Sequence, residues 1–444
     1  MVATASDLST IWRGDAAYEA ARRATCRNQH LPDRFPALIV QALCDADVAA
    51  AVRLAKQQGF AISMCSGGHS WSCNHVREGG MLIDLSRLDA VEIDADAMVA
   101  KVGPGVRGNA LDALLETQGL FFPVGHCYGV GLGGYLLQGG FGWCSRVLGM
   151  ACESVLGIDY VDADGTLRHA SEHENAEVLW AARGSGPGFF GVVVRFHLRL
   201  VRRPPVIGGA LAFYPGARFG AIIRWAQSVG SQVPASVELM FVFSRDAAGE
   251  AGVMMIAAVF AETEADAMRD LAFLDARPDG ALEFKPFKPN SLAVLTEMTM
   301  SHYPEGHNHI VDNLWTHASG DALLPALSHI LDDAPAVPCH FIWMNWSPKR
   351  RRPDMAFSLE DETYIAIYGI WQDPAHENRV ATWVEQGIAR LQPFSTGIQL
   401  ADENLARRAA PFMAPENHAR LEALRVRHDP DARFHTYAHA GAGR

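Results

Sequence analysis

Residues 125–143 read GHCYGVGLGGYLLQGGFGW, and eight of these nineteen positions are glycine. Glycine this dense makes a regular helix or strand costly, because glycine loses more backbone freedom on folding than any other residue. Gly129, Gly131 and Gly134 satisfy G-x-G-x-x-G, yet a dinucleotide-binding fingerprint must open a long helix, and the later glycines would interrupt one. We therefore predict a loop whose bare backbone can approach a flat or phosphorylated ligand closely. The alternative is a turn region that needs glycine only for packing.

Outward from this segment, the first half of the chain alternates apolar runs with helical patterns. The pattern predicts strands at 36–40, 60–65, 81–85, 97–102, 155–161 and 191–200, with helices at 45–58 and 109–118. A double proline at 204–205 forms a natural joint. Beyond it, alternating runs at 238–243 and 253–260 and a helical stretch at 262–274 indicate an α+β second domain.

Composition and charge exclude several classes of protein. The chain of 444 residues carries 38 Lys+Arg against 50 Asp+Glu, a net charge of −12 that disfavours binding to nucleic acid. The apolar runs are too short to span a bilayer, and the N-terminus lacks the pattern of a signal peptide. The eight cysteines are too few for a disulfide scaffold. We expect a cytoplasmic monomer or homodimer that contacts neither membrane nor nucleic acid.

A metal site is a further possibility to weigh. Cys65, His69, Cys73 and His75 offer sulfur and imidazole ligands within a short stretch. Structural zinc sites usually use tighter Cys-x-x-Cys pairs, so we expect no bound metal here. An ordinary, partly exposed histidine in a turn is another interpretation of His69.

Several motifs follow one another in a fixed order. They are PALIV at 36–40, SGGHS at 66–70, VGPG at 102–105, GHCYGVGLGG at 125–134 and GSGPGFFGVV at 184–193. Near the end come Asn417, an Arg-Leu pair at 420–421 and DPDARF at 429–434. Together they resemble the FAD-binding domain of the vanillyl-alcohol oxidase superfamily, in its berberine-bridge-enzyme-like branch. The resemblance is densest over residues 34–200 and returns after about 410.

The resemblance implies an α+β fold of two lobes. A PCMH-type FAD-binding domain is expected at 1–203, with its core at about 34–203. An antiparallel-sheet substrate domain covered by helices is expected at 204–403, and residues 404–444 are expected to return to the FAD-binding domain. FAD would lie at the interface, where a deep cleft is easiest to build.

The resemblance also implies how FAD is held. In that family the histidine of the SGGH loop is joined to the flavin 8α-methyl group, and it corresponds to His69. Some members add a thioether to flavin C6 from a cysteine that corresponds to Cys127, which would need a lowered pKa to react as thiolate. The other positions expected to touch FAD lie in the same motifs and are Ser66, Gly67, Gly68, Ser70, Gly125, Val130, Gly131, Gly133, Gly134, Gly139, Gly142, Gly191, Val193 and Asn417.

The chain departs from the family at three places. Met64 and Cys65 stand where an arginine usually precedes SGGH, Tyr128-Gly129 replaces a more usual Pro-Thr, and Gln399 occupies the position of an expected catalytic tyrosine. Residues 358–371 predict a strand with Tyr364 and Tyr368 on one face. We therefore expect Tyr368 or Tyr364 to be the catalytic base, with Gln399 orienting a substrate hydroxyl.

Charged groups near these positions are predicted to face solvent. They are the basic run at 349–352, the acidic run at 360–362, and the histidine pair His307 and His309, for which the alternative is that they face the cavity. Most charge runs form a solvated surface, because burying an unpaired charge is expensive.

Val130, three positions after Cys127, bears on the choice of electron acceptor. Family members with valine there tend to be oxidases, whereas leucine accompanies dehydrogenases, because the smaller side chain leaves room for dioxygen in a close-packed interior. The expected function is therefore hydride transfer from an alcohol, sugar or secondary metabolite to bicovalently bound FAD, with reoxidation by O2 to H2O2. The alternatives are amine oxidation, a dehydrogenase using another acceptor, a non-catalytic flavin carrier and a zinc-stabilised binding module.

Overall fold

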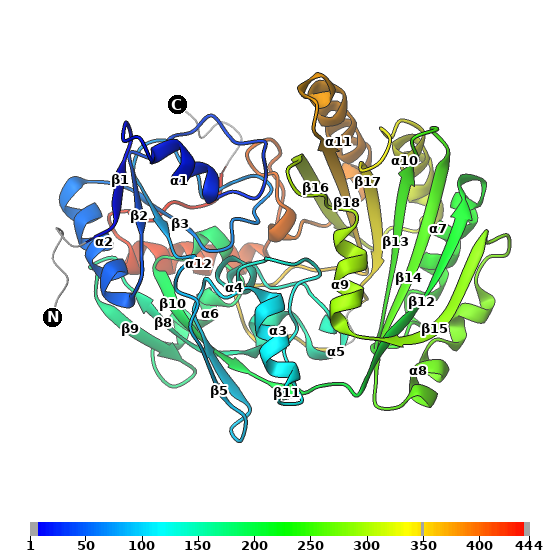
Figure 1. Cartoon of the computed structure of the whole chain (residues 1–444), viewed down its shortest axis with the longest axis horizontal. Helices are drawn as coiled ribbons and strands as arrows, with labels where there is room; N and C mark the ends of the chain where they lie inside the picture. Colours follow the sequence, from blue (N-terminus) through cyan, green and yellow to red (C-terminus); the bar gives the residue numbers. More distant parts are fainter. Residues whose placement is uncertain (1–7, 348–349, 439–444) are drawn as a thin grey trace.

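The computed structural model describes residues 8–347 and 350–438. It shows two lobes side by side, with the first half of the chain and the C-terminal helix in one lobe (Figure 1). The strands form a four-stranded, a five-stranded and a seven-stranded sheet, besides one two-stranded pair. The α+β fold with two lobes is thus confirmed, whereas the domain limits at 203 and 403 stay a prediction.

The first lobe begins with a small sheet in which two strands run parallel to a central third. The order is β1 (Thr10–Trp12), β2 (Leu38–Gln41), β4 (Met81–Asp84) and β3 (Ile62–Cys65), with α1 (Tyr18–Ala24) and α2 (Asp45–Gln58) alongside. Helix α2 has the bounds that the sequence pattern predicts, since its left-handed C-cap Gly59 ends it.

The second sheet of this lobe is antiparallel. Its order is β5 (Val91–Asp94), β6 (Val99–Val102), β10 (Val192–Arg199), β8 (Val155–Val161) and β9 (Leu167–Ser171). The other elements here are the two-stranded pair β7 (Leu120–Phe121) and β11 (Val201–Arg202) and the helices α3 (Gly108–Glu116), α4 (Leu132–Leu137), α5 (Ser145–Leu148), α6 (Ala176–Ala182) and α12 (Pro415–His428). Helix α12 buries Leu421 and Leu424 in the same core as α6, so the end of the chain completes the first lobe.

The second lobe is built on one antiparallel sheet. Its order is β15 (Glu283–Asn290), β12 (Val206–Pro215), β14 (Ala251–Ala261), β13 (Val237–Arg245), β17 (His340–Asn345), β18 (Thr363–Trp371) and β16 (Asn308–Thr316). One face packs on α7 (Phe219–Val229), α8 (Glu264–Asp270), α10 (Gly320–Asp332) and α11 (Glu377–Leu391). The other face turns toward the first lobe, and α9 (Leu292–Met300) lies between the lobes (Figure 1).

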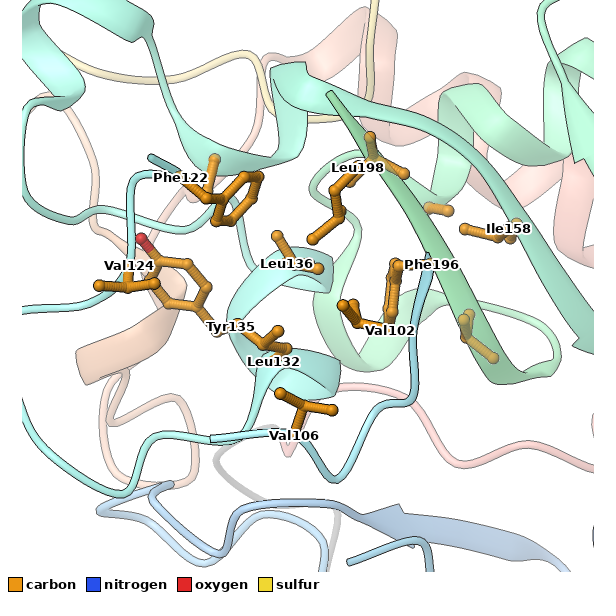
Figure 2. Close-up of a cluster of buried hydrophobic side chains, with 14 of the residues drawn as sticks. Val102, Val106, Phe122, Val124, Leu132, Tyr135, Leu136, Ile158, Phe196 and Leu198 are labelled. Atoms are coloured by element: carbon orange, nitrogen blue, oxygen red, sulfur yellow. The ribbon is translucent and has the colours of Figure 1, made fainter. Parts of the chain in front are cut away.

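The glycine-rich segment contains a short helix that the sequence did not predict. Leu132, Tyr135 and Leu136 of α4 point into an apolar cluster with Phe122 and Phe196 (Figure 2). The Tyr135 hydroxyl donates to the Pro123 carbonyl oxygen at 2.6 Å. Apolar burial against the five-stranded sheet therefore outweighs the low helix propensity of the flanking glycines.

Two glycine loops meet at a backbone contact. A Cβ atom added at Gly67 would lie 2.3 Å from the Gly131 nitrogen, and one added at Gly131 would lie 2.6 Å from the Gly67 nitrogen. Since φ at Gly131 is −75°, any residue could adopt its backbone conformation. Glycine is needed there because the Gly67 backbone leaves no space for a Cβ atom. Gly134 has no atom within 4 Å of an added Cβ.

We predict that Gly67→Ala or Gly131→Ala destabilises the protein by ~1–3 kcal/mol, because backbone atoms cannot yield to the new methyl group. Gly134→Ala is the matched control, and its effect should lie within about 0.5 kcal/mol of wild type. Urea unfolding of the three variants measures this difference. Equal losses in all three would contradict the contact.

Within the described residues, no helix is both long and apolar enough to cross a lipid bilayer.

Candidate functional site

A cavity of about 300 Å³ lies between the first lobe and the inner face of the seven-stranded sheet. Its wall on the first lobe comes from the SGGH loop, the glycine-rich segment and the start of β10. Its opposite wall comes from β13, β17 and β18, together with the short turn at residues 399–402. Nearly all the predicted site residues line it, namely Ser66, Gly67, Gly68, His69, Ser70, Gly125, Cys127, Val130, Gly131, Gly133, Gly134, Gly191, Val193, Tyr364, Tyr368 and Gln399.

Three predicted cofactor contacts lie outside this lining. An added Cβ at Gly139 would meet the Phe357 ring at 2.8 Å, and one at Gly142 would meet the Tyr135 hydroxyl oxygen at 2.2 Å. The Asn417 amide donates to the Met355 carbonyl oxygen at 2.8 Å. Close packing therefore explains the two glycines, and the hydrogen bond that ties helix α12 to Met355 explains Asn417.

Arg107 joins the loops that carry His69 and Cys127. Its Nη1 donates to the Gly67 carbonyl oxygen at 2.8 Å and to the Gly129 carbonyl oxygen at 2.6 Å. With the contact between Gly67 and Gly131, this bridge places both predicted attachment residues on one wall of the cavity.

His69 is a neutral imidazole at physiological pH. Burial lowers its pKa to about 3, and the positive charges of Arg27 and Arg107 act in the same direction. A neutral ring keeps a free nitrogen lone pair, which a nucleophile or a hydrogen-bond acceptor needs.

The lowered pKa that Cys127 would need at the flavin ring stays a prediction, because the protein surroundings alone act in the opposite direction. Burial raises the pKa of this thiol to about 12, although the Arg27 guanidinium opposes the shift. The cause is desolvation, which disfavours the charged thiolate in an apolar cavity. Without a ligand the thiol is therefore protonated.

The cavity holds a carboxylate that the sequence argument passed over. Asp402 Oδ2 accepts hydrogen bonds from the hydroxyls of Tyr364 at 2.5 Å and Tyr368 at 2.9 Å, while Oδ1 accepts from Trp71 Nε1 at 2.9 Å. Burial raises the pKa of Asp402, and the three donors oppose that shift by stabilising the carboxylate. Asp402 is the only carboxylic acid among the described residues that line the cavity.

The same carboxylate changes the character of the two phenols. Desolvation and the charge of Asp402 raise the pKa of Tyr364 and of Tyr368 well above the usual value, so both remain protonated at neutral pH. The period-two pattern did place both on the cavity face of β18, opposite Ile365 and Ile367. A sequence signal for Asp402 exists, since it follows the apolar pair Leu400-Ala401 three positions after Gln399.

Gln399 is buried in the same wall. Its Oε1 accepts from the Ala401 backbone N–H at 2.6 Å, and its Nε2 has no hydrogen-bond partner within the described chain. Ser63 Oγ and His435 Nε2, in the lining on the first lobe, are unpartnered there as well. Buried polar atoms are usually satisfied, so these groups indicate a polar ligand along the cavity. Together with the close backbone approach at the glycines, they fit the FAD that the family resemblance implies.

Two of the surface predictions are wrong, those for His309 and Glu360. His309 is only 2% exposed and its ring centre lies 4.5 Å from that of Trp71. The Glu360 side chain is buried, accepts from Trp346 Nε1 at 2.7 Å and pairs with Arg352. Arg350 and Arg351 are exposed as expected, although Arg350 forms an ion pair with Glu153, and Lys349 lies outside the described residues. Pairing with Arg352 compensates the charge of Glu360 and lets that side chain leave solvent.

Of the four residues weighed as zinc ligands, Cys65, Cys73 and His75 lie around Cys26, whereas His69 is not part of this group. His75 Nε2 lies 3.4 Å from Cys26 Sγ. The described residues place a different group together, Asp159, His169 and His197, whose ligand atoms lie within 4.8 Å of one another. Since Arg195 also donates to Asp159 at 3.1 Å, this carboxylate already has a cationic partner.

The chain is similar to flavoproteins over its whole length. A family model described as an FAD binding domain matches residues 36–171. The FAD-linked oxidoreductase ptmO of Penicillium ochrochloron is 33% identical over 436 residues, which is 97% of this chain and 96% of that protein. The FAD-linked oxidoreductase nodO of Hypoxylon pulicicidum is 29% identical over 443 residues, or 98% of each chain.

Solved structures share the fold. The 6-hydroxy-D-nicotine oxidase of Arthrobacter nicotinovorans superimposes with a TM-score of 0.87 at 21% identity, covering 99% of this chain and 98% of that one. Berberine bridge enzyme from Eschscholzia californica gives a TM-score of 0.83 at 18% identity, covering 97% and 96%. With relatives aligned from end to end, the chain belongs to the FAD-linked oxidoreductases, and it shares the fold of berberine bridge enzyme.

Proposed function

We propose that this enzyme is an oxidase whose FAD is covalently held by His69 and Cys127 and whose proton acceptor is Asp402. When bound, FAD accepts a hydride from the substrate carbon and is reoxidised by dioxygen, which yields hydrogen peroxide. The observation that carries the proposal is the cluster of Asp402, Tyr364 and Tyr368 in the same cavity as His69 and Cys127. The substrate is a small organic molecule, and we propose that the protein acts as a monomer or homodimer.

The attachment follows from where the two nucleophiles lie. His69 presents a neutral ring nitrogen, and Cys127 lies on the loop that Arg107 ties to the His69 loop. Because burial raises the pKa of Cys127 to about 12, the thiol must lose its proton in the course of the reaction. We therefore expect the Cys127 bond to form more slowly than the His69 bond.

If both bonds form, His69→Ala or Cys127→Ala alone leaves the flavin covalently attached through the other residue. Only the double variant releases it on denaturation. Intact-mass measurement of denatured protein decides this, with Cys144→Ala, a buried thiol outside the cavity lining, as the control. Loss of the whole flavin mass from either single variant would show that one bond alone exists.

Asp402 is the group best placed to accept the substrate proton. It is an acceptor with a raised pKa, whereas the hydroxyls of Tyr364 and Tyr368 already donate to it. A base with a pKa brought toward the working pH removes a proton more effectively than an ordinary carboxylate does. The two phenols would hold the carboxylate in place and stabilise its charge, and Gln399 Nε2 would donate to the substrate oxygen.

We predict that Asp402→Asn slows flavin reduction by ~10²-fold or more, the usual contribution of a positioned base. In the wild type, reduction should accelerate as pH rises through the raised pKa of Asp402 and then level off, because only the ionised form accepts a proton. Stopped-flow reduction under anaerobic conditions, measured across pH, tests both statements.

The tyrosines separate this account from one in which a phenol is the base. Tyr368→Phe removes a donor that stabilises the carboxylate, so the profile should move to higher pH while the plateau rate stays within about tenfold of wild type. Tyr364→Phe should act in the same direction. A plateau lowered by ~10²-fold in Tyr368→Phe, with its pH profile unmoved, would instead identify Tyr368 as the base.

Val130 supports an oxidase. It lines the cavity between Gly129 and Gly131, and the Gly108 N–H holds its carbonyl oxygen at 3.0 Å. Among the proteins of the same fold, wild-type Phl p 4 is a glucose dehydrogenase, whereas an isoleucine-to-valine variant of it is a glucose oxidase. A side chain larger by one carbon can fill a void of the size that dioxygen needs.

Val130→Leu is therefore expected to slow reoxidation by air by at least about tenfold, with flavin reduction by substrate little changed. Mixing anaerobically reduced enzyme with oxygenated buffer measures this step alone. Slow reoxidation of the wild-type enzyme would contradict the oxidase and favour a dehydrogenase with another acceptor.

A further inference from the structure

We propose that the substrate is a bulky, apolar ring compound without anionic groups, anchored by one hydroxyl or amine hydrogen on Asp402. This inference rests on the proposed function, since it concerns the same cavity. It distinguishes this chain from relatives that act on sugars, such as the xylooligosaccharide oxidase of Thermothelomyces thermophilus, which is 36% identical over 200 residues.

The inner face of the seven-stranded sheet presents apolar side chains in cross-strand rows. In one row Met240 of β13 pairs with Met344 of β17, which pairs with Tyr364 of β18. The adjacent row on the same face joins Val242, Ile342 and Ala366. Met240, Ile342, Met344 and Tyr364 line the cavity. This wall therefore offers a ligand methyl groups, thioethers and a ring.

Aromatic rings add to this wall. The ring centre of Tyr303 lies 5.0 Å from that of Tyr368, and Phe141 meets Tyr364 edge-on at 5.4 Å. Methionine sulfur and aromatic faces both interact favourably with rings, and methionine adapts its shape to irregular ones. A ring system is the apolar ligand that fits these partners best.

Polar groups on the substrate side are few. Among the described residues of the lining, Asp402 is the sole carboxylic acid, and Gln399 Nε2 is an unsatisfied donor. The hydroxyls of Tyr364 and Tyr368 donate to Asp402, that of Thr299 donates to the Leu295 carbonyl oxygen, and that of Tyr303 interacts with Tyr368. A sugar carries several adjacent hydroxyls, and each one that is buried without a partner costs about 1–3 kcal/mol. Met240, Ile342 and Met344 cannot provide those partners.

Charge argues in the same direction. Arg77 is the single arginine or lysine among the described residues of the lining, and it donates to Asn74 and to the Thr436 carbonyl oxygen in the first lobe. No such cation faces the sheet side of the lining, so a carboxylate or phosphate on the substrate would have no partner there and would be repelled by Asp402. A neutral compound or an amine needs no cationic partner and is not repelled by Asp402.

The test is a titration of the oxidised holoenzyme, in which binding is measured by the shift of the flavin absorption spectrum. The probes are 2-naphthylmethanol, 2-naphthylmethylamine, benzyl alcohol, 2-naphthoate, glucose and xylobiose. We expect a naphthyl alcohol or amine to bind on the order of tenfold more tightly than benzyl alcohol, because a second ring is buried. The naphthoate and the two sugars should bind at least tenfold more weakly than the naphthyl alcohol or amine, by about 1.4 kcal/mol or more. The alcohol and amine arms show which hydrogen donor Asp402 selects.

Met344→Gln provides the mutational test, because it keeps the shape of the side chain and adds a polar head. It should weaken 2-naphthylmethanol binding on the order of tenfold while leaving flavin content unchanged. Met268→Gln is the matched control, since Met268 is 56% exposed on α8. This variant should bind 2-naphthylmethanol as tightly as the wild type does. Met240→Gln replaces Met344→Gln if the latter loses its flavin.

Tighter binding of glucose or xylobiose than of 2-naphthylmethanol would overturn the proposal, and so would equal binding by the Met344 and Met268 variants. Binding is read before turnover, so these results are independent of the oxidase assignment. Absence of peroxide with every bound probe would count against the proposed oxidase and would leave the ranking of the ligands intact.

Discussion

The backbone contact between Gly67 and Gly131 is the constraint on which the site depends. Two loops from distant parts of the chain approach so closely that neither position has space for a Cβ atom. Arg107 then holds both loops by their carbonyl oxygens. Because of this contact, His69 and Cys127 share one wall of a cavity whose other wall belongs to the second lobe. The glycines of residues 125–143 that face the cavity therefore allow the two loops to pack closely and also leave room for a ligand.

Desolvation determines the chemistry available within that cavity. The same burial lowers the pKa of His69 to about 3, raises that of Cys127 to about 12 and raises that of Asp402. Each shift favours the neutral form of the group. Three donors to the Asp402 carboxylate oppose the rise of its pKa, which suits a group proposed to gain and lose a proton during turnover. The apolar wall that causes this desolvation is also the surface proposed to bind the substrate.

Much of the fold could be predicted from the sequence because its signals are local. Helix α2 has its predicted bounds, and the alternating pattern places Tyr364 and Tyr368 on one face of β18. Residues such as Asp402 and His309 were missed or placed in solvent, because their surroundings come from segments hundreds of positions away. The Asp402 carboxylate accepts from Trp71, 331 residues earlier, and His309 donates its backbone N–H to Asn28, 281 residues earlier. No local pattern reports such pairs. Helix α4 was missed for a related reason, since its stability comes from the core that it joins.

The most direct test of this account is a crystal structure of the holoenzyme as purified with FAD. His69 and Cys127 would hold the isoalloxazine ring from the first lobe, and the Asp402 carboxylate would face it from the opposite wall. Continuous electron density should join the ring to both attachment residues, and the substrate space should lie against Met240 and Met344. A ring bound elsewhere, or one that turns its edge away from Asp402, would contradict the account.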